Sequence, residues 1–126
     1  MHIEIVDGLP FVSLELSYGG KKTNLKRVLL DTGSYSTIVS SDRLHDIGLV
    51  YEPDDKIRQI RGVGATEFVF TKSLERIVID QHVITDISVE AGSLDYGFEL
   101  DGILGMDILV NATAIIDLKH MELKVT

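Results

Sequence analysis

The chain has 126 residues, of which 44% are hydrophobic, and it carries a formal net charge of −8 at pH 7. This length suits one sizeable hydrophobic core, so we expect residues 1–126 to form a single domain. The acidity argues against a nucleic-acid partner. The sequence shows no long apolar run and no secretory leader, so we expect no membrane partner and a cytoplasmic location. It has no cysteine, which excludes disulfides, a thiolate metal site and a thiol nucleophile.

Short segments rich in Val, Ile, Leu and Thr recur between glycines and aspartates, which predicts an all-β fold with few helices. From the start of the chain, we expect strands at residues 2–6 and 11–16, joined by a turn at 7–10. Further strands are expected at residues 24–31 and 36–40. The first part of the chain therefore reads as a series of strands.

The next two segments predict a helix and a hairpin. Residues 40–49 begin with serines that can cap a helix, place Leu44 and Ile47 on one face, and include a glycine that can end it, so we expect one short helix. Residues 56–70 place Gly62-Val63-Gly64 between two arms that can pair, which predicts a long hairpin with a glycine-rich tip.

The second half of the chain supplies more strands. We expect them at residues 74–80 and 82–91, and a strand, turn and strand over residues 114–125. The segment DGILGMDIL, residues 101–109, is short, apolar and interrupted by glycine. We expect it to form one or two helical turns packed on the core.

Several motifs do not fit a nucleotide or metal site. Gly62-x-Gly64 lacks the third glycine and the following helix of a dinucleotide site. The acids at 54–55 and at 99 and 101 lack the spaced oxygen ligands of a calcium loop, and the four histidines have no short ligand spacing. We therefore expect no metal site and no cofactor.

The stretch VLLDTGS, residues 28–34, ends an apolar run with an acid, Asp31. An ionised carboxylate beside a buried strand costs free energy unless it is paired or used. Taken alone, Asp-Thr-Gly fits an ordinary β-turn, because Asp and Gly are common turn residues. A match to Asp-Thr/Ser-Gly arises by chance in roughly one in twenty chains of this size. Its context favours a functional site, because the glycine-tipped hairpin follows and a second apolar-apolar-glycine segment, Ile103-Leu104-Gly105, lies beyond it.

In this order, LLDTGS, RGVGA and DGILGMDIL resemble the retropepsin-like aspartic proteases over most of the chain. The helix expected after LLDTGS makes the chain more similar to the small bacterial members, because the compact retroviral enzymes lack a helix there. The resemblance implies a pepsin-like single-lobe closed barrel of the all-β class with one or two short helices. It makes Asp31 the catalytic residue and Ile103, Leu104 and Gly105 the support behind its loop. It also implies a flap that binds substrate through Arg61, Gly62, Val63, Gly64 and Ala65.

The resemblance also assigns supporting roles to the residues after Asp31. Thr32 would hydrogen-bond across a two-fold axis to the partner loop, and Gly33 would leave space for a tight loop and for the substrate backbone. Ser34 can donate a hydrogen bond to the Asp31 carboxylate, which would favour its ionised form.

Two positions depart from the pattern of the retroviral members. Those enzymes typically carry an acid four residues after the catalytic Asp, paired with an Arg directly after the distal glycine. Here the two positions are Tyr35 and Met106. That ion pair is therefore absent, and we expect the packing near the site to differ.

Hydrolysis of an amide by carboxylates needs one base and one acid, but the chain holds a single Asp-Thr-Gly loop. The resemblance therefore implies a homodimer that brings two copies of Asp31 together, where at about 3 Å they share one proton. We expect an aspartic endopeptidase that acts on extended peptide or protein segments. The terminal segments, 2–6 and 121–125, are expected to interleave with those of the partner.

Two alternatives remain open. The chain can be a catalytically inactive dimerisation or peptide-binding module that keeps the fold, or a monomeric β-domain with Asp31 in a plain turn. Light scattering over a dilution series separates the monomer from the two dimeric possibilities.

Overall fold

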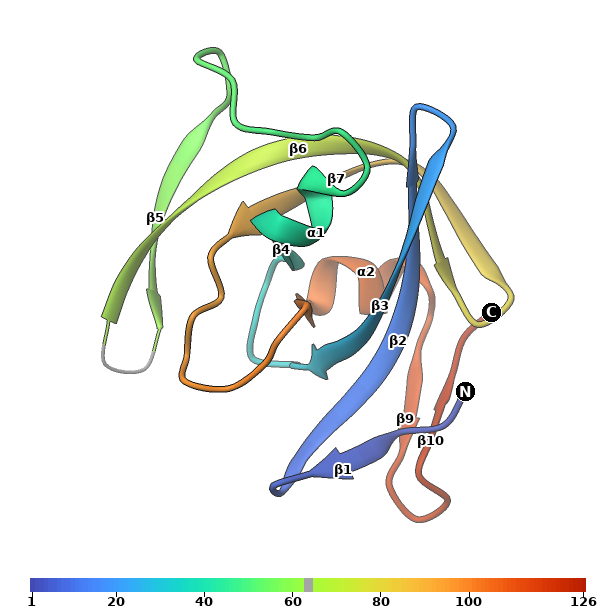
Figure 1. The fold of residues 1–126 in the computed structure, drawn as a ribbon. Helices are drawn as coiled ribbons and strands as arrows, with labels where there is room; N and C mark the ends of the chain where they lie inside the picture. Colours follow the sequence, from blue (N-terminus) through green and yellow to red (C-terminus); the bar gives the residue numbers. More distant parts are fainter. Residues whose placement is uncertain (63–64) are drawn as a thin grey trace.

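The computed structural model describes residues 1–62 and 65–126, and at residues 61, 62 and 65 it describes the backbone alone. Strands predominate in this part of the chain (Figure 1). In chain order the elements are β1 (Glu4–Val6), β2 (Leu9–Tyr18), β3 (Lys21–Leu30), β4 (Ile38–Ser40), α1 (Ser41–His45), β5 (Ile57–Gly62), β6 (Ala65–Ile79), β7 (His82–Gly92), β8 (Gly102–Leu104), α2 (Met106–Asn111), β9 (Ile115–Asp117) and β10 (Glu122–Lys124).

Six of the strands close into a barrel, in the order β2, β3, β8, β4, β7 and β6. The barrel closes where Glu15 to Ser17 of β2 pair antiparallel with Arg76 to Val78 of β6. β1 extends the barrel beside β2, and β5 pairs with the first part of β6 to form a hairpin that projects from the barrel (Figure 1). The expected all-β closed barrel with short helices is confirmed.

Most expected elements are present, but two predictions were wrong. The strands expected to end at residue 70 and to begin at residue 74 form one continuous strand, β6, of 15 residues. The segment 101–109 was expected to form one or two helical turns; the helix α2 is present from Met106, but Gly102–Leu104 before it is the strand β8, which was not expected. β8 is an extended segment because it is buried between β3 and β4 and pairs with both.

β6 continues through a polar stretch, where it stays paired with β7 in one register, and it carries the buried cation Lys72. Its side chain is 6% exposed, and its ammonium group donates to Asp55 at 2.9 Å and to Glu52 at 3.3 Å. Burial opposes the charge on Lys72, but these two carboxylates outweigh burial and raise its pKa. Lys72 therefore holds the 50–56 loop against β6 without breaking the strand.

The core has two parts. The larger fills the barrel and includes Leu16, Val28, Leu44 and Ile108. The smaller lies where the hairpin meets the barrel, and it consists of Phe11, Ile38, Val69, Leu94, Leu100 and Ile103. Because Leu29, Ile60 and Tyr96 pack against this smaller core, it fixes the surface from which the candidate site is built.

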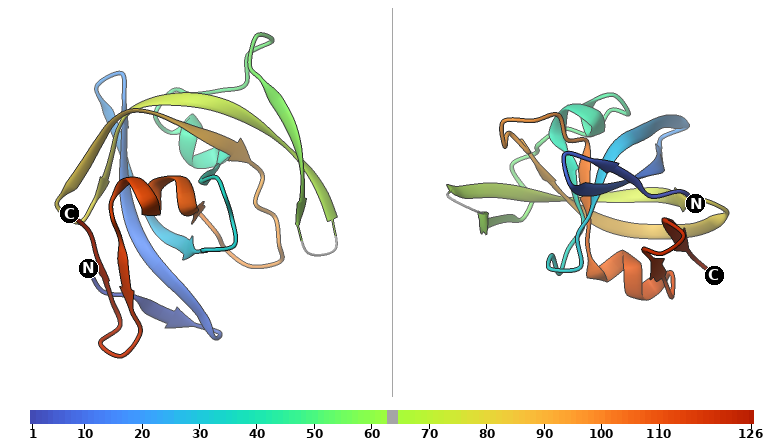
Figure 2. Two further views of the ribbon diagram at one scale, coloured as in Figure 1. Left: turned by 180° about the vertical axis from the view of Figure 1, so that it is seen from behind. Right: turned by 90° about the horizontal axis from the view of Figure 1, so that it is seen from below.

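The two ends of the chain pair with each other. His2 bridges Glu122, and the Ile3 N–H donates to the Met121 carbonyl oxygen at 2.8 Å. The termini accordingly lie close together in both views of Figure 2. The terminal segments, which were expected to interleave with a partner, are thus paired within one chain.

No helix in residues 1–62 and 65–126 has the length and apolar character needed to cross a membrane.

Candidate active site

Asp31 follows directly from β3 at the mouth of the barrel. β3 and β8 run parallel with Leu30 opposite Leu104, and the Asp31 N–H donates to the Leu104 carbonyl oxygen at 3.1 Å. Leu30 is 7% exposed and Leu104 is fully buried, whereas Asp31 is half-buried. The change from apolar to acidic residues in the sequence therefore marks the point where the chain leaves the core.

A tight turn orients the Asp31 carboxylate. The Gly33 N–H donates to Asp31 Oδ1 at 2.9 Å, and the Ser34 N–H donates to the Asp31 carbonyl oxygen at 3.2 Å. A Cβ at Gly33 would lie 3.2 Å from Oδ1, so a side chain there would crowd the carboxylate. Thr32 and Gly33 are exposed at this turn.

The predicted hydrogen bond from Ser34 to the Asp31 carboxylate is wrong for this structure. The Ser34 hydroxyl donates instead to the Ser36 carbonyl oxygen at 2.7 Å. The loop folds back after Asp31 and brings a backbone acceptor close to Ser34. Ser34 therefore shapes the loop and does not contact the carboxylate.

The loop rests on the segment that joins β8 to α2. The Met106 N–H donates to the Ser34 carbonyl oxygen at 2.7 Å, and the Gly105 N–H donates to Thr37 Oγ1 at 3.0 Å. A Cβ at Gly105 would lie 2.4 Å from the Ser36 carbonyl oxygen. The structure thus brings Ile103, Leu104 and Gly105 behind the loop, where the sequence predicted them.

Thr37 and Asp107 complete this support and were missed in the sequence. Thr37 is 1% exposed, and its N–H and hydroxyl donate to the two carboxylate oxygens of Asp107 at 3.1 and 2.8 Å. Asp107 also accepts from the Ile108 N–H at 2.8 Å. The available signal was an acid two residues after Gly105, because a carboxylate is favoured in the first turn of a helix.

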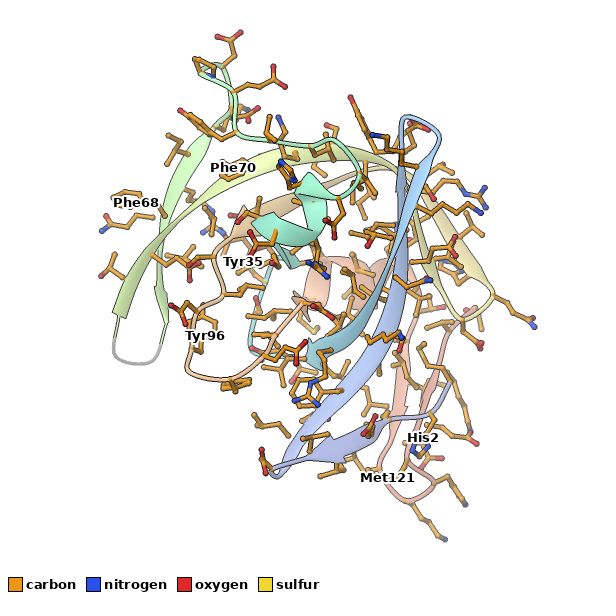
Figure 3. The ribbon with its side chains drawn as sticks, in the orientation of Figure 1. His2, Tyr35, Phe68, Phe70, Tyr96 and Met121 are labelled. Atoms are coloured by element: carbon orange, nitrogen blue, oxygen red, sulfur yellow. The ribbon has the colours of Figure 1, made fainter. Side chains whose placement is uncertain are left out.

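A cleft of about 800 Å³ opens in front of Asp31. The Asp31 loop forms one side of it, and Arg58, Gln59 and Ile60 of β5 form the opposite side. Tyr35 and Tyr96, which also line the cleft, lie between the hairpin and the barrel (Figure 3). A half-buried carboxylate thus lines a cleft that is also lined by the hairpin strand β5, an arrangement able to hold a peptide chain beside an acid or base.

One corner of the cleft holds a charged cluster. The Arg58 guanidinium donates through Nε and Nη2 to the Glu90 carboxylate, with Nε 3.2 Å from Oε2, and its centre lies 4.6 Å from the Tyr35 ring centroid. The hydrogen bonds that Arg58 donates to Glu90 raise the pKa of Arg58. Tyr35 therefore contacts the cation of Arg58 on the hairpin strand.

Glu67 joins the hairpin to the wall of the cleft. The Tyr96 hydroxyl donates to Glu67 Oε2 at 2.8 Å, and Glu67 Oε1 accepts from Ser93 Oγ at 3.1 Å and from the Leu94 N–H at 3.2 Å. Glu67 belongs to β6, so these bonds tie the second strand of the hairpin to the loop before β8.

Burial raises the pKa of Tyr96 to about 12, and the Glu67 carboxylate adds to the shift. The folded-state pKa of Tyr96 lies above the ordinary value of 10. The contribution of the protonated Tyr96 hydroxyl to folding stability is therefore complete below pH 10 and is lost as the pH rises toward 12. We expect an alkaline absorbance titration to show a late tyrosinate step that Tyr96→Phe removes and Tyr18→Phe retains. A late step that persists in Tyr96→Phe would contradict this assignment.

The predicted flap residues are only partly described. Gly62 pairs with Ala65, and Arg61 pairs with Thr66, at the end of the β5–β6 hairpin. Val63 and Gly64 lie outside the described residues. The described strands therefore form the hairpin that was predicted for residues 56–70.

In comparisons with known proteins, a model of the family described as aspartyl protease matches residues 14–108. No curated protein matches the chain. One solved structure that matches is the EIAV protease complexed with the inhibitor HBY-793, at 21% sequence identity and a TM-score of 0.63. The match covers 90% of this chain and 96% of the viral chain, and it shows a shared retropepsin-like fold.

Proposed function

This chain belongs to the aspartyl protease family, and from that premise we propose that it is an aspartic endopeptidase that hydrolyses peptide bonds. The observation that carries the proposal is the position of Asp31. Its carboxylate is oriented by Gly33, stands at the end of a buried strand, and faces the cleft beneath the hairpin. Its loop is supported from behind by Gly105 and by the Thr37–Asp107 pair.

The active form that we propose is a homodimer. Each chain contributes one Asp31, while the reaction needs one carboxylate as base and another as acid. Thr32 and Gly33 are exposed beside Asp31, so a second copy can approach the turn across a two-fold axis. The two carboxylates, brought within about 3 Å, would hold one proton between them and titrate as a pair.

The paired carboxylates then account for hydrolysis. The unprotonated one takes a proton from water, whose oxygen bonds to the scissile carbonyl carbon, while the protonated one donates its proton to the carbonyl oxygen. The tetrahedral intermediate collapses by breaking the C–N bond. As the C–N bond breaks, the dyad gives its proton to the leaving nitrogen, and one hydroxyl of the tetrahedral intermediate returns a proton to the dyad. The dyad therefore ends with one proton, as it began.

The substrate that fits this cleft is an extended peptide segment. The hairpin strand β5 borders the cleft through Arg58, Gln59 and Ile60, so a bound chain can align with it as an added strand. Leu29, Ile38 and Ile103 give the opposite part of the cleft an apolar lining. The proposal therefore includes protein substrates cut at exposed, strand-like segments.

Cleavage of a diverse peptide pool, measured from about pH 4 to 7 and at decreasing enzyme concentration, tests the proposal. We expect cleavage without added cofactor, and we expect activity per chain to fall as the protein is diluted toward the dimer dissociation constant. Sedimentation at the same concentrations measures the dimer. Activity strictly proportional to enzyme through the range where the dimer dissociates would contradict the shared site.

A further inference from the structure

The charged corner of the cleft contains an arginine held rigidly at the surface. Arg58 reaches from β5 across to the loop that follows Asp31, where its Nη2 donates to Ser36 Oγ at 3.3 Å and its guanidinium covers the Tyr35 ring. Glu90, on β7, binds Nε and Nη2 from the other side. The guanidinium is therefore held by contacts with the loop after Asp31 and with β7.

This anchoring leaves one nitrogen of Arg58 for a ligand. Nε and Nη2 are occupied, whereas Nη1 is hydrogen-bonded to no acceptor in residues 1–62 and 65–126. The Arg58 side chain is 37% exposed and lines the cleft, while that of Glu90 is 11% exposed. Because the buried carboxylate already balances the charge, Arg58 can present a fixed donor to the cleft without an unpaired buried ion.

A side chain of the substrate is the group that Arg58 can reach. When an extended peptide aligns with β5, its backbone groups pair with those of the strand, and its side chains project toward the two faces. Arg58 projects from β5 toward Tyr35, so it meets a side chain on that face. The guanidinium is a planar donor that matches planar oxygen acceptors.

We propose that Arg58 determines specificity by donating a hydrogen bond to a carboxylate or carboxamide oxygen on a substrate side chain. This inference rests on the proposed function, because it assumes that the cleft binds an extended peptide. Asp, Glu, Asn and Gln carry the required oxygen. In a two-fold dimer the corner occurs twice, so the preference appears at one position on each side of the scissile bond.

Position-specific peptide libraries test this inference. At each substrate position, the quantity measured is the ratio of kcat/KM for peptides with Gln or Glu to kcat/KM for peptides with Leu. We expect Arg58→Met to lower that ratio about tenfold at the two positions and to leave preferences elsewhere unchanged. Arg58→Met/Glu90→Gln removes the carboxylate charge that the single variant leaves unpaired, so it should give the same loss with better folding. Arg76→Met, at an exposed position on β6, is the matched control.

The same ratio is measured as peptide affinity in an Asp31→Asn background, where catalysis is not needed. Loss of the ratio with Arg58→Met in that background supports the inference, and its retention in both Arg58 variants overturns it. Failure of the wild-type protein to cleave any peptide overturns the proposed hydrolysis alone, because the affinity ratio still tests Arg58.

Discussion

Asp31→Asn is expected to eliminate peptide cleavage while the protein keeps its fold and the proposed dimer. In the proposed dimer the substitution changes both copies, so neither a carboxylate base nor a carboxylic acid remains at the site. Acid–base catalysis by a positioned side chain contributes about 10²–10⁴-fold, so we expect cleavage to fall by at least about 10³-fold when both roles are lost. The Asn carboxamide oxygen can still accept from the Gly33 N–H, which preserves the turn.

The control for this variant is Asp42→Asn, because Asp42 is an exposed acid in the first turn of α1, away from the cleft lining. It should cleave the peptide pool at the wild-type rate. Sedimentation and circular dichroism of both variants establish that dimer and fold are retained. Wild-type cleavage by Asp31→Asn would show that this carboxylate is not catalytic.

Mixing the two proteins makes the test sharper. When wild-type and Asp31→Asn chains exchange freely, wild-type dimers form in proportion to the square of the wild-type fraction. If both aspartates are needed, activity follows that square. A linear decline would show that each chain acts alone, and it would contradict a site shared across the two-fold axis.

Local sequence patterns predicted the framework of the fold. Alternating residues identified β1 and β2, and the apolar run that ends at Asp31 identified both β3 and the place where the chain leaves the core. The continuity of β6 was not predictable from local pattern. A lysine such as Lys72 is expected in solvent, as in a loop between two strands, until its pairing with Asp55 is known. β8 was missed because a three-residue apolar strand has no periodicity to distinguish it from a helix.

The candidate site shows the same division between local and distant information. Asp31 and Gly33 interact across two residues, so their turn was predictable. Thr37 and Asp107 are separated by 70 positions, Arg58 and Glu90 by 32, and Tyr96 and Glu67 by 29. Without an alignment of related sequences, nothing in one chain indicates which distant polar side chains will meet.

Ser34 illustrates the limit even within the loop. Its hydroxyl was expected to contact Asp31 three positions earlier, but the loop turns so that the Ser36 carbonyl oxygen is nearer. A residue type fixes which groups can bond, whereas the direction of the backbone decides which of them do.

Gly105→Ala is expected to destabilise the protein severely, because the added methyl has no room. The ideal Cβ would lie 2.4 Å from the Ser36 carbonyl oxygen, 2.6 Å from the Ser36 carbonyl carbon and 2.8 Å from the Ser34 carbonyl oxygen. All three are backbone atoms, so no side chain can rotate away. The φ of Gly105 is −98°, which suits any residue, so the effect comes from space and not from backbone conformation.

To admit the methyl, the loop that carries Asp31 must separate from the segment before α2. That movement breaks the bonds from the Met106 N–H to Ser34 and from the Gly105 N–H to Thr37 Oγ1. Overpacking of this kind costs about 3 kcal/mol when the neighbours cannot yield, and the lost hydrogen bonds add to it. We expect the melting temperature to fall by roughly 10 °C or more.

Thermal and urea unfolding measure the loss, with Val110→Ala as the control. Val110 is 64% exposed on α2, so its truncation should change the free energy of unfolding by only about 0.5 kcal/mol. Below its melting temperature, Gly105→Ala should also cleave peptides poorly, because the displaced loop carries Asp31 away from the geometry that the proposed pair of aspartates requires. A Gly105→Ala protein with wild-type stability and activity would show that the close approach to Ser36 is not required.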